Sequence, residues 1–178
     1  MKYAPLLFLL ISLTTISACS PPAEKEAKAY EDISGFFEAE AVRLSKSESP
    51  VRKTVARNDA VETRVVKAIN WNTELSLFAE SDINKPAWRD SYKVTASDTN
   101  IIYLAKDTTL KTRQIHISKA PGGKIRKISI HNRTNNMLYS STETLLYIPD
   151  SLYQIQKQQH VVLIGNNSYL IKGISINK

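Results

Sequence analysis

The chain has 178 residues, a formal net charge of +7 and one cysteine. One cysteine excludes an intramolecular disulfide and a cysteine-rich zinc site, and five glycines leave little material for a glycine-rich phosphate-binding loop. The charge is uneven, because residues 20–107 carry 13 Lys and Arg against 15 Asp and Glu, whereas residues 108–178 carry 10 against 2.

The first 18 residues have the pattern of a secretory signal peptide. Lys2 precedes a nearly unbroken apolar run from Ala4 to Leu13, and small residues follow it. A retained transmembrane helix is the alternative, but such a helix needs roughly 20 apolar residues, well above the length of this run. We therefore expect residues 1–18 to be cleaved from the mature protein.

The segment Ile16-Ser17-Ala18-Cys19 resembles the lipobox of bacterial lipoproteins. This resemblance implies that Cys19 becomes the first residue of the mature chain, with a diacylglycerol thioether on its sulfur and an acyl group on its amine. An incidental thiol next to an ordinary cleavage site is the alternative. Ser20 stands where an inner-membrane lipoprotein of the enteric type carries aspartate, so the resemblance points to the outer membrane, facing the periplasm.

The mature chain reads as a short tether followed by one domain. Residues 19–30 hold the lipidated cysteine and a polar segment with two prolines, and residues 31–178 have the size of a single domain. Apolar residues at helical spacing predict amphipathic helices at 32–46 and 70–83, on either side of a hairpin formed by 51–57 and 61–69.

From Ser91 onward, short runs rich in Ile, Val, Tyr and Thr predict an antiparallel meander. The expected strands are 92–96, 101–106, 112–118, 124–132, 137–148, 153–157, 160–165 and 168–176. The firmest expected turns are Ala120-Pro121-Gly122-Gly123 and Gly165-Asn166-Asn167, because glycine and asparagine tolerate positive φ. The prediction is an α+β fold, with the two helices packed on a curved sheet.

That order of elements, together with the expected cellular address, also resembles the half-barrel of the periplasmic lipoprotein carriers and their outer-membrane receptor. The likeness is one of architecture, without a shared motif, and function does not follow from architecture alone. It implies a cavity for acyl chains beneath the helices. Tyr139, Tyr147, Tyr153 and Tyr169 could line such a groove, although tyrosines in a sheet more often fill the seam between sheet and helix.

The sequence contains no recognisable catalytic or metal-binding motif. His116, His131 and His160 stand far from one another in sequence, and no nucleophile elbow or His-Glu-x-x-His segment is present. We therefore predict no catalytic residue, no metal site and no cofactor. A hydrolase with a site assembled from distant residues is a lesser alternative.

The stretch from Thr108 to Thr142 is the one segment whose composition suggests a ligand, because it is rich in Lys and Arg and has no acidic residue. Its candidate ligand-binding residues are Lys111, Arg113, Lys124, Arg126, Lys127 and Arg133. Such a patch could hold the phosphates of lipopolysaccharide or phospholipid, or an acidic envelope protein, whereas nucleic acid is out of reach of an exported protein. The alternative is a solvated outer face of the sheet.

Overall fold

A computed structural model describes residues 28–176 of the chain. The signal segment, the lipobox with Cys19 and most of the expected tether lie outside the described residues, so those predictions stay predictions.

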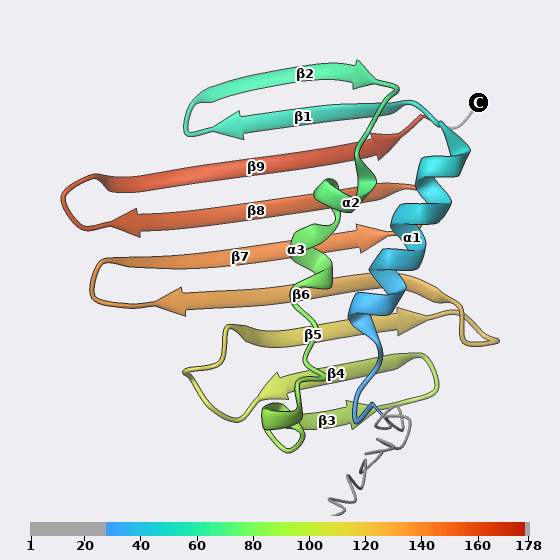
Figure 1. Ribbon diagram of the computed structural model, residues 1–178, viewed down its shortest axis with the longest axis vertical. Helices are drawn as coiled ribbons and strands as arrows, with labels where there is room; N and C mark the ends of the chain where they lie inside the picture. The colour runs from blue at the N-terminus through green and yellow to red at the C-terminus, as the bar shows by residue number, and fades with distance from the viewer. Residues whose placement is uncertain (1–27, 177–178) are drawn as a thin grey trace, which may run out of the picture.

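The domain is an α+β fold built on one antiparallel sheet of nine strands, in the order β2-β1-β9-β8-β7-β6-β5-β4-β3 (Figure 1). The strands are β1 Val51–Arg57, β2 Ala60–Val66, β3 Tyr92–Ala96, β4 Asn100–Ala105, β5 Thr112–Lys119, β6 Ile125–Asn135, β7 Tyr139–Ile148, β8 Leu152–Val161 and β9 Gly165–Ser175. The meander from β3 to β9 follows the chain, as predicted. The N-terminal hairpin β1–β2 then joins the last strand, because β1 pairs with β9.

Side-chain alternation explains why these segments form strands with one buried face. Ile115 and Ile117 on β5 face Ile130 and Ile128 on β6 across the ladder, and all four are fully buried. The same row continues to Leu145 on β7, which is also fully buried. A period of two thus places the apolar residues on one side of the sheet.

Helix α1 (Ile33–Ser47) lies across this buried face, as Figure 1 shows. Ile33, Phe37 and Ala41 recur every four residues and are its buried residues. The Asp32 side chain caps the helix by accepting a hydrogen bond from the Gly35 amide at 2.8 Å. The helix ends at Glu48, which adopts a left-handed conformation with φ 46°.

The expected continuous helix at 70–83 is wrong. The segment instead forms two single-turn helices, α2 (Trp71–Glu74) and α3 (Ser76–Ala79), and a 3-10 turn η1 (Pro86–Trp88) follows. Leu75 breaks the helix with φ −98° and ψ 3°, and the Ser76 hydroxyl donates to the Thr73 carbonyl at 3.0 Å, which offers the backbone an alternative to helical bonding. Leu75 and Phe78 are buried, so packing on the sheet outweighs local helix propensity.

Predicted strand boundaries also differ, most of all around β8 and at the end of β2. The expected strands 153–157 and 160–165 are one strand, β8, and the turn to β9 lies at 162–164 instead of at 165–167. The reason is register, since ten residues of β8 pair with β7 without interruption. The predicted strand 61–69 ends at Val66. The predicted turn 120–123 is confirmed, with φ of 88° and 85° at its two glycines.

The core between the helices and the sheet is aromatic and tightly filled. The Phe37 ring lies 4.9 Å from the Phe78 ring and 5.1 Å from the Tyr147 ring, centroid to centroid. The cavity beside Trp71 and Tyr153 at this interface measures about 30 Å³, whereas pockets for small-molecule ligands usually measure about 300 Å³ or more. No helix in residues 28–176 has the length and apolar character needed to cross a bilayer.

Candidate binding face

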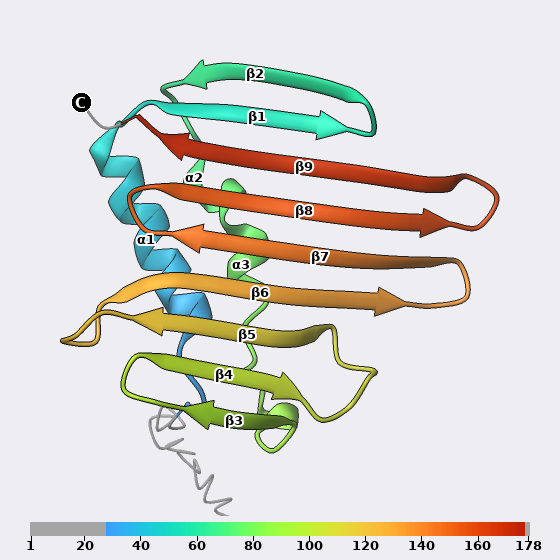
Figure 2. The same ribbon diagram turned by 180° about the vertical axis from the view of Figure 1, so that it is seen from behind.

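The two faces of the sheet differ in what covers them. Helices α1, α2 and α3 lie on one face, which we call the inner face. Seen from behind, the opposite face presents all nine strands with no described element across it (Figure 2). We call this the outward face.

Register identifies the residues of the outward face, because directly paired residues point to the same side. One row runs from Leu170 through Gln156 and Thr144 to His131 and Gln114 across β9, β8, β7, β6 and β5. Each of these positions is a sequence neighbour of an inner-face residue. Glutamine, threonine, serine and histidine dominate such rows, so the face is mainly polar.

The outward face is cationic and has no acidic residue at its strand positions. The strands contain only Glu62 and Glu143 as acids, and both belong to inner-face rows. The basic residues at outward strand positions are Arg52, Lys93, Lys127, Arg133 and Lys172. None of the five forms an ion pair with another described residue. The field of these charges is therefore directed at solvent.

The candidate residues predicted from sequence divide into two groups at opposite ends of the β5–β6 hairpin. Lys124, Arg126 and Lys127 lie at the β5–β6 turn, where Arg126 and Lys127 border a shallow depression of about 680 Å³ together with Asn100. Eight residues of extended strand, about 27 Å, separate Ile125 from Arg133.

Lys111, Arg113 and Arg133 form the other group. The backbone amide of Arg133 donates to the carbonyl of Lys111 at 2.8 Å, which places these two residues side by side. The two groups thus border one hairpin without forming a single patch.

Two β-bulges explain why the basic stretch does not alternate cleanly in sequence. The register of β5 with β6 shifts between Thr112 and Gln114, and again between Ser118 and Lys119. Arg113 is the extra residue at the first bulge and Arg126 at the second. A bulge redirects the side chain it adds. The Arg113 guanidinium accordingly turns back to the Asp107 carbonyl, to which its Nη1 donates at 3.0 Å.

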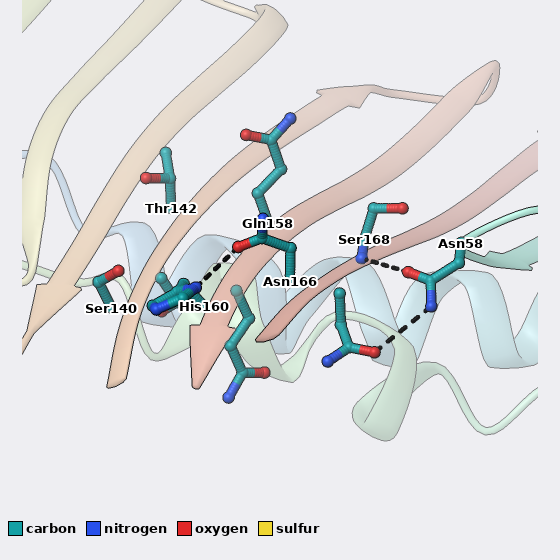
Figure 3. Close-up of a pocket in the computed structure, with 10 residues that line it drawn as sticks. Asn58, Ser140, Thr142, Gln158, His160, Asn166 and Ser168 are labelled. Atoms are coloured by element: carbon teal, nitrogen blue, oxygen red, sulfur yellow. Dashed lines mark hydrogen bonds between the residues drawn. The ribbon is translucent and has the colours of Figure 1, made fainter. Parts of the chain in front are cut away.

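Amide and hydroxyl side chains gather at the ends of β7, β8 and β9 that lie away from α1, around a shallow pocket of about 490 Å³ (Figure 3). His160 Nδ1 lies 2.8 Å from the Asn166 side-chain oxygen, and the Ser168 amide donates to Asn58 at 2.8 Å. Sequence reasoning missed this pocket. Its residues come from four separated segments, and the only local signal was the density of Asn, Gln and Ser.

A buried polar cluster on the inner face was also missed. Asn132 is 1% exposed, and its side-chain amide donates to the Ser81 hydroxyl at 2.9 Å. Glu143 is also buried, and its Oε1 atom lies 3.3 Å from Lys157 Nζ. These contacts connect the segment after α3 to the sheet, while the buried Asn132 Oδ1 has no hydrogen-bond partner among the described residues. Within residues 28–176, no group of three His, Cys, Asp or Glu is arranged to hold a metal ion.

The tyrosines divide between core and rim. Tyr147 and Tyr153 are buried and donate hydrogen bonds to Glu40 and Glu74 on the helices, at 2.7 Å for the second pair. Burial and these hydrogen bonds raise the pKa of both phenols well above the usual range, so they stay protonated at neutral pH. Tyr139 and Tyr169 are only half-buried.

No protein-family model, no curated protein and no solved structure matches this chain. The function therefore has to be argued from the surfaces themselves.

Proposed function

We propose that this protein is a lipoprotein of the outer membrane whose periplasmic domain binds an acidic envelope protein on its outward face, without catalysis. The observation that carries the proposal is that this face is bare, cationic and free of acidic residues at its strand positions. A face with unpaired positive charge attracts a partner of opposite charge and raises its association rate.

The size and composition of the face support a protein partner. Nine strands spaced by about 4.8 Å make the sheet roughly 38 Å wide, and β8 is about 34 Å long. A standard interface needs only about 800 Å² per partner. Exposed apolar side chains, among them Val65, Leu104 and Ile174, lie between the polar ones. A mixed surface of this kind is typical of non-obligate interfaces.

The filled interior argues against the alternative of a lipid or lipoprotein carrier. A carrier of the half-barrel type needs an apolar cavity under its helices, and the cavity at that place measures about 30 Å³. The space is occupied by Phe37, Phe78 and Tyr147. Phosphate groups of an anionic amphiphile fit the same charges, and the experiment below distinguishes them from a protein.

The test reverses outward charges and follows a salt-dependent interaction. The triple variant Lys127→Glu, Arg133→Glu, Lys172→Glu is compared with Lys46→Glu, Lys67→Glu, Lys85→Glu, which changes net charge equally at exposed residues off the outward face. Envelopes are crosslinked at two ionic strengths that differ roughly tenfold, and the lipidated proteins are then purified from them. We expect one protein partner to be recovered at low salt with the wild type and the control triple, and lost with the outward triple, because exposed charge pairs are screened.

Partner recovery that is equal for all three proteins would remove the outward face as the binding site. Intact mass spectrometry of the same samples settles the ligand class, because bound lipid without a protein partner contradicts the proposal in favour of an amphiphile. Reversal of Lys124, Arg126 and Lys127 in a further variant tests whether the β5–β6 turn belongs to the interface.

A further inference from the structure

Two neighbouring turns at the ends of the strands carry apolar side chains away from the core. The β6–β7 turn spans residues 136–138 and the β8–β9 turn spans residues 162–164. The amide of Val162 donates to the carbonyl of Leu138 at 3.0 Å, so the two turns lie side by side. We call them the paired tips. They are at the left of the sheet in Figure 1, away from α1.

The paired tips are the most exposed apolar feature of the described chain. Leu163 is 102% exposed, Met137 95%, Ile164 75% and Leu138 73%. Single exposed apolar residues are ordinary on a protein surface, but a contiguous group usually marks a contact with another apolar phase.

The backbone conformation of the two turns holds these side chains in the solvent. Leu163 has φ 74°, a left-handed conformation in which glycine or asparagine is favoured. In the other turn, the Asn136 side chain accepts hydrogen bonds from the amides of Leu138 and Tyr139, both at 2.9 Å. A strained leucine and a side-chain-capped turn are features of tips held in a defined shape.

A polar, weakly basic belt lies directly behind the paired tips. Residues 133–142 and 158–169 contain no Asp or Glu, and they include Arg133, His160 and the half-buried Tyr139 and Tyr169. Amides and hydroxyls fill the rest of the belt (Figure 3). Apolar side chains at the tip, with tyrosine and basic residues one layer behind, form the gradient found where proteins enter a bilayer surface.

The acidic residue next in sequence to the belt is Glu143, which is buried on the inner face and pairs with Lys157. Asp59 lies in the β1–β2 turn, next to Asn58 of the shallow pocket. It is two residues from Arg57, whose guanidinium lies 5.8 Å from the centre of the Tyr169 ring. The charge around the paired tips is therefore compatible with anionic headgroups.

We propose that the paired tips insert into the headgroup region of the phospholipid bilayer to which the protein is anchored. Two turns form a narrow, convex contact, whereas a stable protein interface needs about 800 Å² on each side with complementary shape. A fluid bilayer requires no such complementarity.

The choice of bilayer rests on the lipid anchor of the proposed function. Eight residues lie between Cys19 and Lys28, so the nine steps from Cα to Cα reach at most about 31 Å, comparable to the length of β8, about 34 Å. Anchor and tips can thus engage the same membrane.

The chain has one natural cysteine, and lipidation would consume its thiol, so a cysteine introduced elsewhere can be labelled specifically. A free thiol introduced by Ile164→Cys is labelled with an environment-sensitive fluorophore in the full chain, in vesicles of phosphatidylethanolamine and phosphatidylglycerol. Ser151→Cys is the matched control, because it lies in the exposed β7–β8 turn at the opposite end of these strands. We expect a blue-shifted emission at 164 that is quenched by a lipid-borne quencher at least about fivefold more than at 151, because only a group within the membrane meets such a quencher.

A second pair of variants tests the cause. Met137→Ser with Leu163→Asn removes tip apolarity, and asparagine accepts the positive φ at 163, so the turn keeps its shape. This pair should abolish the quenching at 164, whereas Val61→Thr with Val65→Thr, which removes two exposed valines on β2, should leave it unchanged.

Equal, solvent-like emission at 164 and 151 overturns the proposal. So does a blue shift at 164 that requires added envelope protein, because the tips would then bind protein. The mass of the purified chain reports the anchor separately. An unlipidated chain that combines Cys19→Ser with Ile164→Cys has one thiol, so its label on vesicles reports position 164 without the anchor. Failure of the tips and failure of the anchor are therefore distinguishable.

Discussion

Gly173 and Tyr153 show how closely single residues are matched in this sheet. They are directly paired on β9 and β8, and the Tyr153 ring lies over the glycine. A Cβ at position 173 would meet the Tyr153 Cε1 atom at 2.0 Å. The same phenol donates to Glu74, which also pairs with Lys53. The absence of a side chain at 173 thus fixes how the α2 turn connects to the sheet.

We predict that Gly173→Ala lowers the free energy of unfolding by about 1–3 kcal/mol, because the added methyl group displaces the Tyr153 ring. Urea unfolding followed by circular dichroism measures the change. In a Tyr153→Ala background the same substitution should cost little, since the ring is gone. Equal costs in both backgrounds would show that the effect comes from elsewhere.

At the scale of elements, α1 is held by charged contacts at its start and in its middle. The Asp32 carboxylate accepts from Lys28 and from the Gly35 amide, which lowers the pKa of Asp32. Glu40 is partly buried, which by itself raises its pKa, but hydrogen bonds from Arg43 and Tyr147 outweigh burial and the pKa is lowered. Both carboxylates therefore stabilise the folded state in their charged form.

We predict that stability decreases in acid because of these two groups. Their folded pKa values lie below the unfolded ones, about 3.9 for Asp and 4.3 for Glu. Their contribution is fully present above that range and is lost as pH falls through the lower, folded values.

The Asp32→Asn variant isolates the pH-dependent contribution that the Asp32 carboxylate makes to stability. Asparagine keeps a capping oxygen but does not ionise, so the stability difference from wild type should shrink as pH falls below about 4. Thermal unfolding at a series of pH values measures this difference. A difference that stays constant with pH would rule out the titration of Asp32. The Asp32→Ala variant loses the cap as well and should cost about 1 kcal/mol at pH 7.

At the scale of the whole molecule, the proposed anchor and the paired tips define how the domain stands on a membrane. We predict that the mature wild-type chain begins at Cys19 and carries a lipid modification there, as the lipobox resemblance implies. A Cys19→Ser variant should keep residues 1–18 and lack the lipid. Intact mass spectrometry of detergent-solubilised protein checks both points. A wild-type chain cleaved at another position with a free thiol would contradict the anchor.

Local patterns in the sequence predicted part of the fold correctly. The period of 3.6 over residues 32–46, the alternation along residues 112–118 and 124–132 and the paired glycines at 122 and 123 all correspond to observed elements. These features depend on residues close in sequence, so propensity and periodicity detect them. The basic stretch does not alternate cleanly in sequence, and the structure has two bulges within it.

Pairing between distant segments decided the rest. The sequence did not reveal that β1 joins β9, or that tertiary packing breaks the segment after Asn70 into two turns. The basic stretch was one block along the chain, but the bulges and the length of β6 divide it between the two ends of a hairpin. The bare outward face and the paired tips likewise exist only after nine strands have aligned. Sequence by itself determined which residues alternate, turn and carry charge, whereas the tertiary structure decided which of them meet, because strand order and register are set by non-local contacts.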